Sequence, residues 1–243
     1  SLTLLTPAVA IILTLAVGVA IFGLLGFSPF GSLYTFFVAP ISRPDQIGDL
    51  FVKACPLIIT ATGLVFCFRA NVWNIGAEGQ LIFGAIFSGW VALNFPDWPA
   101  IILMPAMILA SIIGGICWAM IPALLKVRFN TNEILVSLML TYVAALFIDW
   151  LVRGPWRDPM SFGFPLTKMY SDAGLIQRID LPFVGTLGQL HWGVVGALFL
   201  AAAGGFVLSR TILGFQIKVM GDAPRAGQFA GFEPHLVTIG VMA

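Results

Sequence analysis

The sequence predicts an all-α, polytopic membrane protein, a helical bundle whose surface mostly faces lipid. Of the 243 residues, 59% are apolar and only 9% are charged, whereas roughly 25% of the residues of a soluble domain are charged. So few charges cannot cover a water-soluble globule of this size, and the mean hydropathy is +1.00. Six segments also reach the roughly 20 mostly apolar residues that a membrane-spanning helix needs. These observations exclude a soluble enzyme, a disordered chain and a nucleic-acid binder.

The predicted spans follow one another along the chain, mostly with short connections. The first has 24 residues without a charge, which is too long for the apolar core of a signal peptide. Pro56 and Gly63 predict a kink in the second span, and Pro105 and Pro122 interrupt the fourth. From residue 236 onward the sequence is apolar again, which predicts the beginning of a seventh span in a chain whose C-terminal part is missing. The six complete spans cover residues 4–27, 50–68, 75–95, 100–125, 134–152 and 192–213.

Two connections are longer than the others. Residues 154–190 contain the turn-rich strings GPWRDP and LPFVGTLG, which predict an ordered loop outside the membrane and not a separate domain. Residues 214–235 carry charges of both signs. They could form one short helix between Gly221 and Gly231, with Pro224 in its first turn.

The distribution of lysine and arginine over the short loops favours a cytoplasmic N-terminus. In that orientation each side of the membrane carries six basic residues, so the raw counts are equal. Four of the outer six belong to or flank the 154–190 loop, and without them the count is six inside against two outside. The inner residues are Arg69, Lys126, Arg128, Arg210, Lys218 and Arg225, and the outer ones are Arg43, Lys53, Arg153, Arg157, Lys168 and Arg178.

The connection between the second and third spans is the most unusual stretch of the chain. It reads FRANVWNIGAEGQ over residues 68–80 and places polar side chains beside apolar segments. A charged side chain at lipid depth costs about 2.5–3.5 kcal/mol and usually faces a cavity or a partner. The candidate residues of a substrate pathway are therefore Asn74, Gly76, Glu78 and Gln80.

Two interpretations of this connection remain open. A break followed by a helix start presents free backbone N–H groups at the positive end of the helix dipole. Glycine at such a place lets a ligand or another backbone approach closely, and broken helices of this kind form binding sites in transporters. The alternative is a polar cytoplasmic turn in which Arg69 pairs with Glu78, and the residues alone do not separate the two.

The remaining polar residues have simpler interpretations. Glu133 follows a short polar run and lies in the first turn of a helix, where an acidic side chain suits the dipole. Asp149 lies four residues before Arg153, which allows an ion pair on one helix face, with a proton-relay role for Asp149 as the alternative. The cysteines all lie within apolar runs and are predicted to be small buried packing residues; they are Cys55, Cys67 and Cys117.

No catalytic, metal-binding or cofactor-binding residue is predicted. The sequence contains no HExxH, GxSxG or Walker GxxxxGK[ST] motif. Its three cysteines lack metal-ligand spacing, and two histidines cannot build a His-rich metal centre. We therefore expect no enzyme, and in particular no means of hydrolysing ATP within this chain.

Four strings of the sequence resemble one family of membrane proteins. NIGAEGQ over residues 74–80 is similar to a segment of the permease subunits of bacterial ABC importers of the simple-sugar and nucleoside type, which belong with the branched-chain amino acid and ribose permeases. RFNTNEILVSLMLTY resembles the approach to the fifth core helix of the family, and RGPWRDP resembles the start of its external loop. TILGFQIKVMGDAPRAGQFAGF, residues 211–232, resembles the cytoplasmic loop that touches the ATPase. The resemblance extends over residues 50–232.

The resemblance implies a fold of two inverted repeats of about five helices each. Residues 1–153 would hold the first repeat, residues 154–190 the external loop, and residues 191–243 the beginning of the second repeat. The loop over residues 214–235 would then couple to the ATPase. The residues implied in coupling are Gly221, Asp222, Pro224, Ala226, Phe229 and Gly231. The family usually has two adjacent alanines where this chain has Ala226-Gly227.

The resemblance also implies the partners and the place of the protein. They are two ATPase subunits, a second permease that is identical or related, an extracytoplasmic binding protein and the inner membrane of a bacterium. The transported solute would be a nucleoside or a simple sugar, and the NIGAEGQ form favours nucleosides over pentoses. The alternative is an ion-coupled secondary transporter or channel that uses Glu78 and Asp149 as coupling carboxylates. The 214–235 loop discriminates between them, because an ion-coupled carrier needs no ATPase docking site.

Overall fold

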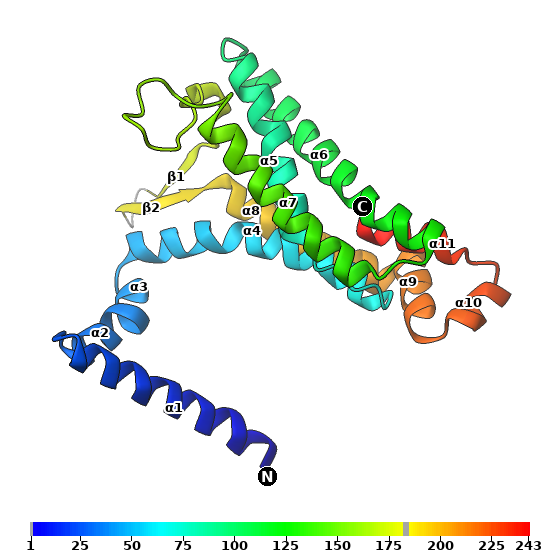
Figure 1. Cartoon of the computed structure of the whole chain (residues 1–243), viewed down its shortest axis with the longest axis horizontal. Helices are drawn as coiled ribbons and strands as arrows, with labels where there is room; N and C mark the ends of the chain where they lie inside the picture. Colours follow the sequence, from blue (N-terminus) through cyan, green and yellow to red (C-terminus); the bar gives the residue numbers. More distant parts are fainter. Residues whose placement is uncertain (1, 182–184) are drawn as a thin grey trace. The chain divides into compact units, whose positions relative to one another are not determined.

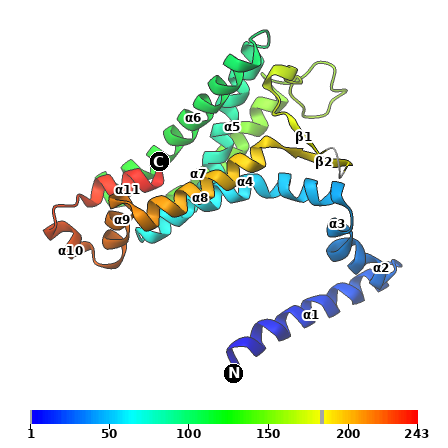
Figure 2. The ribbon, with the colours of Figure 1, turned by 180° about the vertical axis from the view of Figure 1, so that it is seen from behind.

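The computed structural model describes residues 2–181 and 185–243, and these residues are mostly helical (Figures 1 and 2). The prediction of an all-α membrane protein is confirmed, with one small exception in a two-stranded sheet. In chain order the elements are α1 (Leu2–Leu24), α2 (Pro29–Leu33), the π-helix η1 (Tyr34–Val38), α3 (Ala39–Ser42), α4 (Pro44–Arg69), α5 (Ala77–Asn94), α6 (Ala100–Phe129), α7 (Glu133–Arg153), the 3-10 helix η2 (Asp172–Gly174), β1 (Arg178–Leu181), β2 (Gly185–His191), α8 (Trp192–Arg210), α9 (Ile212–Asp222), α10 (Pro224–Phe229) and α11 (Pro234–Met242).

Five helices of the described chain are long and apolar enough to cross a membrane, namely α1, α4, α6, α7 and α8. The sequence predicted six spans, and the third is the one that falls short. Its helix, α5, begins at Ala77 and has only 18 residues. Glu78 and Gln80 in its first turn and Asn94 at its end leave a shorter apolar stretch than the prediction assumed.

The chain forms two compact units. The first contains Ser1–Cys55 and Arg178–Val194, and the second contains Pro56–Gln177 and Val195–Ala243. The unit boundaries fall within α4 and α8 and differ from the repeat boundaries expected at residues 153 and 191. The inverted repeat therefore stays a prediction.

In the first unit, a β-hairpin contacts the first turns of α4. β1 and β2 pair antiparallel, with Arg178 opposite His191. The backbone N–H of Gln189 donates to the Asp49 carboxylate at 2.8 Å. Gly188, at φ 59°, lies so close to the Asp45 carbonyl that no side chain fits there. The sequence predicted this loop without strands; its end is held as a strand by contacts with α4, which local sequence does not report. Part of the LPFVGTLG string, residues 182–184, lies outside the described residues.

In the second unit, α5 packs against both α6 and α7. The Phe83 ring of α5 stacks on Trp118 of α6 at 3.7 Å between centroids and also faces Phe147 of α7 at 5.6 Å. Small residues let the helices approach closely. Gly114 of α6 lies against the Phe83 carbonyl, and Gly204 of α8 lies against Thr62 and Phe66 of α4.

We expect Gly114→Ala to loosen the contact between α5 and α6. A Cβ at this position would lie 2.6 Å from the Phe83 carbonyl oxygen and 2.7 Å from the Phe87 ring, so backbone or ring must move. Overpacking of this kind costs about 1–3 kcal/mol. Thermal unfolding in detergent should show a lower midpoint for Gly114→Ala than for the wild type. Gly115→Ala is the control, because its Cβ meets only the Gln80 carbonyl at 3.6 Å, and an equal midpoint for both variants would contradict this packing.

Candidate functional site

The site is built where α4 ends and the chain turns toward α5. The turn is a Schellman motif with Asn71 in the left-handed region at φ 56°. The N–H of Val72 donates to the Cys67 carbonyl at 2.9 Å, and the N–H of Asn71 donates to the Phe68 carbonyl at 3.1 Å. This geometry stops α4 sharply and directs the following residues along the unit's interior as an extended segment.

Asn74 fixes the last part of this segment. Its side chain is only 3% exposed, and its Oδ1 accepts the Gly76 N–H at 2.9 Å. The Ile75 N–H donates to the buried hydroxyl of Ser137 in α7 at 3.1 Å. A Cβ on Gly76 would lie 2.9 Å from the Ser137 Cβ, so glycine is required for this approach. The break followed by a helix start, one of the two interpretations left open by the sequence, is therefore present, and the helix begins at Ala77 instead of the predicted Ile75.

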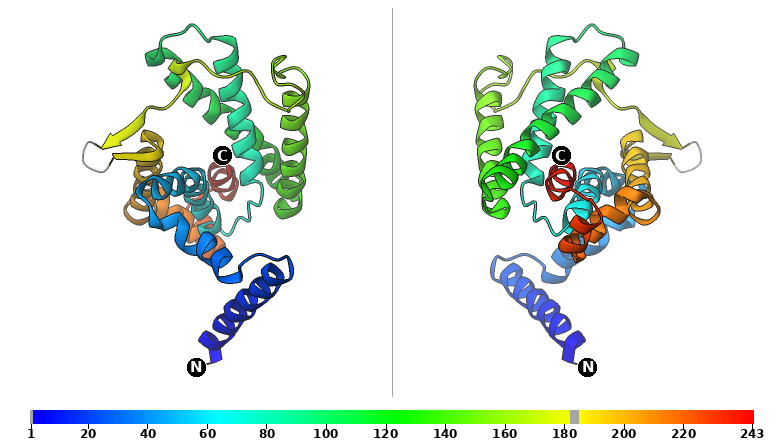
Figure 3. Two further views of the ribbon diagram at one scale, coloured as in Figure 1. Left: turned by 90° about the vertical axis from the view of Figure 1, so that its left-hand side faces the viewer. Right: turned by 90° about the vertical axis from the view of Figure 1, so that its right-hand side faces the viewer.

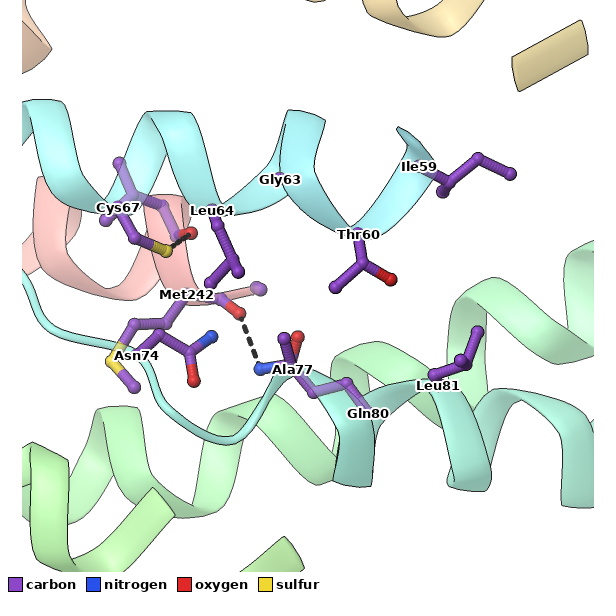
Figure 4. A pocket seen from close by; sticks show the side chains of 12 residues that line it. Ile59, Thr60, Gly63, Leu64, Cys67, Asn74, Ala77, Gln80, Leu81 and Met242 are labelled. Atoms are coloured by element: carbon purple, nitrogen blue, oxygen red, sulfur yellow. Dashed lines mark hydrogen bonds between the residues drawn. The ribbon is translucent and has the colours of Figure 1, made fainter. Parts of the chain in front are cut away.

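A cavity of about 230 Å³ opens beside this break (Figure 4). The Gln80 side chain lies at its edge and donates from Nε2 to the Met242 carbonyl at 3.3 Å. The Cys67 thiol donates to the Val241 carbonyl at 2.7 Å. The lining is mostly apolar, with the side chains of Thr60, Asn74 and Gln80 as its polar groups and no charged side chain. Its walls are Ile59, Thr60, Gly63, Leu64, Cys67, Asn74, Ala77, Gln80, Leu81, Val241, Met242 and Ala243.

The structure brings Asn74 and Gln80 together at this cavity, but it does not bring Glu78 to them. Ala77, Gln80 and Leu81 share the helix face that lines the cavity, as expected at spacings of three and four residues. Glu78 lies on another face of α5, is exposed and is absent from the lining. The pairing of Arg69 with Glu78 is not among the ion pairs of the described residues either.

Sequence reasoning missed three polar contributors to the site: Thr60, Ser137 and the backbone carbonyls of α11 (Val241 and Met242). Thr60 and Ser137 are hydroxyl residues inside apolar spans, and that signal could have drawn attention to them. The carbonyls carry no sequence signal, because any residue supplies one.

We expect Ser137→Ala to weaken the segment that leads into α5. The substitution leaves the partly buried Ile75 N–H without its acceptor, and loss of one such hydrogen bond costs about 0.5–1.5 kcal/mol. Hydrogen exchange should show faster opening of residues 72–76 in this variant. Ser209→Ala is the control, since that hydroxyl bonds only within its own helix; unchanged exchange in Ser137→Ala would contradict the role of the serine.

The predicted coupling segment is more helical than expected. The sixth predicted span ends at Arg210, three residues early, and Thr211 caps a new helix, α9, with its hydroxyl accepting the Gly214 N–H at 3.2 Å. The predicted short helix is present as α10, with Pro224 in its first turn. Gly231 ends α10 at φ 82° in a Schellman motif, as predicted.

Gly221 does not mark the start of the predicted short helix. It lies inside α9 and does not turn the chain. Its backbone packs directly on the carbonyl of Arg69 at the end of α4, where a Cβ would clash. Ala226 and Asp222 are exposed, and Phe229 is 95% exposed, so α10 presents an apolar side chain without a partner in the described chain.

Both arms of α10 lead back to the cavity. Through α9, Gly221 contacts the Arg69 carbonyl, a few residues before Asn74. Through α11, the Val241 and Met242 carbonyls accept hydrogen bonds from Cys67 and Gln80. Figure 3 shows α11 (red) beside α4, and the apolar cluster that joins these elements contains Ala70, Val72, Ala123, Leu208, Ile217 and Met242.

The structure also tests the predictions made for Asp149, Glu133 and the three cysteines. Asp149 and Arg153 form the predicted ion pair at 2.7 Å. Glu133 is in the first turn of α7, and it also pairs with Lys126 at 2.9 Å. The prediction for the cysteines is correct for Cys55 and Cys67 but wrong for Cys117, which lies on an exposed face of α6.

The sequence of this chain is similar to those of known transport proteins. The family profile described as branched-chain amino acid transport system / permease component matches residues 46–243. A glucose ABC transporter permease of Haloferax volcanii is 33% identical over 96% of this chain and 62% of its own length. A guanosine ABC transporter permease of Bacillus subtilis is 31% identical over 95% of this chain and 65% of its own length. A nucleoside ABC transporter permease of Lactococcus lactis is 26% identical over 94% of this chain and 64% of its own length. The chain thus spans less than two thirds of the length of these relatives, and no solved structure matches it.

Proposed function

The chain belongs to the family of branched-chain amino acid transport system permease components, and on this premise we propose that it is a permease subunit of an ATP-driven importer. It passes a nucleoside or a simple sugar from an external binding protein to the cytoplasm. ATP is hydrolysed on separate subunits, and this chain is not an enzyme. The pathway residues are Asn74, Gly76, Glu78 and Gln80, and the ATPase is coupled through Gly221, Asp222, Pro224, Ala226, Phe229 and Gly231.

One observation carries this proposal: the exposed helix α10 is joined through two packed arms to the cavity. An ATPase can drive a permease only through a part that moves as a body, because a free loop would dissipate the displacement. α9 rests on the end of α4 at Gly221, and α11 is hydrogen-bonded to Cys67 and Gln80. A displacement of α10 would therefore reach both sides of the cavity.

The nature of the solute is supported by the cavity and by the relatives. The cavity offers amide and hydroxyl groups on an apolar wall, without a charged side chain. Such a lining suits an uncharged solute that is rich in hydroxyl or amide groups. The relatives are named for glucose, guanosine and nucleosides.

The partners follow from the same proposal. They are two ATPase subunits, a second permease, identical or related, and an external binding protein, in the inner membrane of a bacterium. The ion-coupled alternative is less well supported. Asp149 is paired with Arg153 and Glu78 is exposed on another helix, so no described cavity joins these two carboxylates.

The proposal is tested by reconstituting the full permease with its ATPase and binding protein in proteoliposomes. Uptake of labelled guanosine and of labelled glucose should require ATP, and at least one of them should saturate. Titration of the binding protein with both solutes identifies the substrate. Uptake driven by an ion gradient without ATP would refute the importer.

The orientation is tested with a cysteine at Lys168, in the loop after α7. We expect a membrane-impermeant thiol reagent to label Lys168→Cys from outside intact cells, because the N-terminus is proposed to be cytoplasmic. The Cys117→Ser background removes the exposed native thiol. Labelling only after the inner face is opened would reverse the orientation.

A further inference from the structure

The loop after α7 carries an unusual apolar tip, defined here as residues 159–167 with the sequence PMSFGFPLT. It contains no charged residue. Phe162 is 96% exposed, Met160 77% and Phe164 68%. A contiguous exposed apolar group of this kind marks a contact surface for a protein or for a membrane.

The tip is held in place by its own hydrogen bonds. The Ser161 side chain is buried and its hydroxyl lies 2.7 Å from the Asp158 carbonyl and 2.9 Å from the Phe164 carbonyl. The Asp158 N–H donates to the Leu166 carbonyl at 2.8 Å, which closes the loop. Phe162 adopts a left-handed conformation at φ 49°, which is costly for a bulky side chain. The fold thus supports a strained backbone that leaves two phenylalanine rings exposed.

The base of the loop is anchored to the bundle. Gly89 of α5 leaves room for the Tyr170 hydroxyl and the Trp156 ring, both of which would lie within 3.4 Å of a Cβ there. Burial raises the pKa of the Tyr170 phenol above its usual value, so this anchor stays uncharged. Gly174, in η2, packs against Leu103 and Met107 of α6. Contacts on both sides therefore hold the base of the loop in place. The tip extends beyond the end of α7 (Figure 1).

We propose that this tip inserts into the interfacial layer of the bilayer and anchors the loop to lipid. α7 is a candidate membrane span that ends at Arg153, and the tip begins six residues later, so it lies close to the end of that span along the chain. Trp150, in the last turn of α7, is also exposed, and tryptophan favours this layer. Apolar side chains on an interfacial segment are buried roughly 5–10 Å into the boundary between headgroups and acyl chains.

Lipid fits the tip better than a protein partner does. Protein interfaces have a polar rim with direct hydrogen bonds, whereas the one serine of the tip is buried and bonded within it. A partner that docks and leaves would also expose both phenylalanines to water in each cycle, while the bilayer is always present. The flanking Arg157 and Lys168 are exposed and can remain among the lipid phosphates. This inference does not depend on the proposed transport function.

The test uses spin labels on the full permease in phospholipid nanodiscs, in a Cys117→Ser background. Labels are placed at Met160→Cys, Phe162→Cys and Phe164→Cys, and at Gln177→Cys, an exposed polar position of the same loop, as the aqueous control. We expect relaxation by oxygen to exceed relaxation by a water-soluble nickel chelate several-fold at the three tip positions, with the reverse at Gln177→Cys. Met160→Cys and Phe164→Cys avoid the strained position, so these two labels still report on the tip if Phe162→Cys changes the local conformation.

Three other results would each overturn the proposal. Access of the nickel chelate to all three tip positions would place the tip in water. Access that is lost only when the external binding protein is added would make the tip a protein-docking surface. Protection from both relaxants would bury it against a second copy of the permease.

Discussion

Phe229→Ala is expected to leave ATP hydrolysis running while uptake falls to background. Phe229 is the apolar side chain that α10 presents, and it is 95% exposed in the isolated chain. If it fills a pocket on the ATPase, its truncation costs about 2 kcal/mol or more, which is roughly 30-fold in docking affinity. The ATPase then turns over without moving α10, so hydrolysis and uptake separate.

The measurement is the ratio of solute taken up to ATP hydrolysed in proteoliposomes. Gln228→Ala is the matched control, because Gln228 is exposed on the same helix and is not an apolar anchor. Docking of the external binding protein should be unchanged in both variants. A wild-type ratio in Phe229→Ala would mean that α10 is not the coupling element, and the importer proposal would lose its main structural support.

The membrane spans and some helix ends are the features that could be predicted best from the sequence. Long uncharged runs predicted five of the helices correctly, because lipid imposes one requirement on every residue of a span. The stop of α10 at Gly231 and its start at Pro224 were also predictable, since both residues restrict the backbone locally. The error at the third span came from treating Ile75 and Gly76 as helical, whereas hydrogen bonds to Ser137 and Asn74 hold them outside the helix.

The cavity could be predicted only in part. Asn74 and Gln80 stood out because they are polar within an apolar region. Asn74 accepts a hydrogen bond from nearby Gly76, whereas Gln80 donates to the Met242 carbonyl, 162 residues further along the chain, and no local pattern encodes such a distance. Glu78 attracted attention for the same reason as its neighbours, but helical geometry turns it to another face of α5. The hairpin was missed because its strands depend on contacts with Asp45 and Asp49.

Gln80→Leu is expected to abolish most uptake while the complex still assembles. The substitution keeps the approximate volume but removes the amide that bonds the Met242 carbonyl and faces the cavity. One lost hydrogen bond of about 1.4 kcal/mol corresponds to about tenfold in rate, and the loss of a polar group on the solute's path adds to it. Asn94→Ala is the control, because that amide bonds within α5 at its far end.

Glu78→Ala is measured beside Gln80→Leu. We expect Glu78→Ala to lose uptake, while the permease still assembles with its ATPase. A carboxylate that is exposed on a helix within a membrane bundle needs water or a partner, and the pathway of the assembled transporter would supply one. Assembly is followed by co-purification of the ATPase, and uptake by labelled solute. Normal uptake by Glu78→Ala together with a defect in Gln80→Leu would show that Glu78 is not part of the pathway. The pathway would then be restricted to the face of α5 that carries Gln80. Normal uptake by both variants would show that the cavity beside α5 is not on the path of the solute.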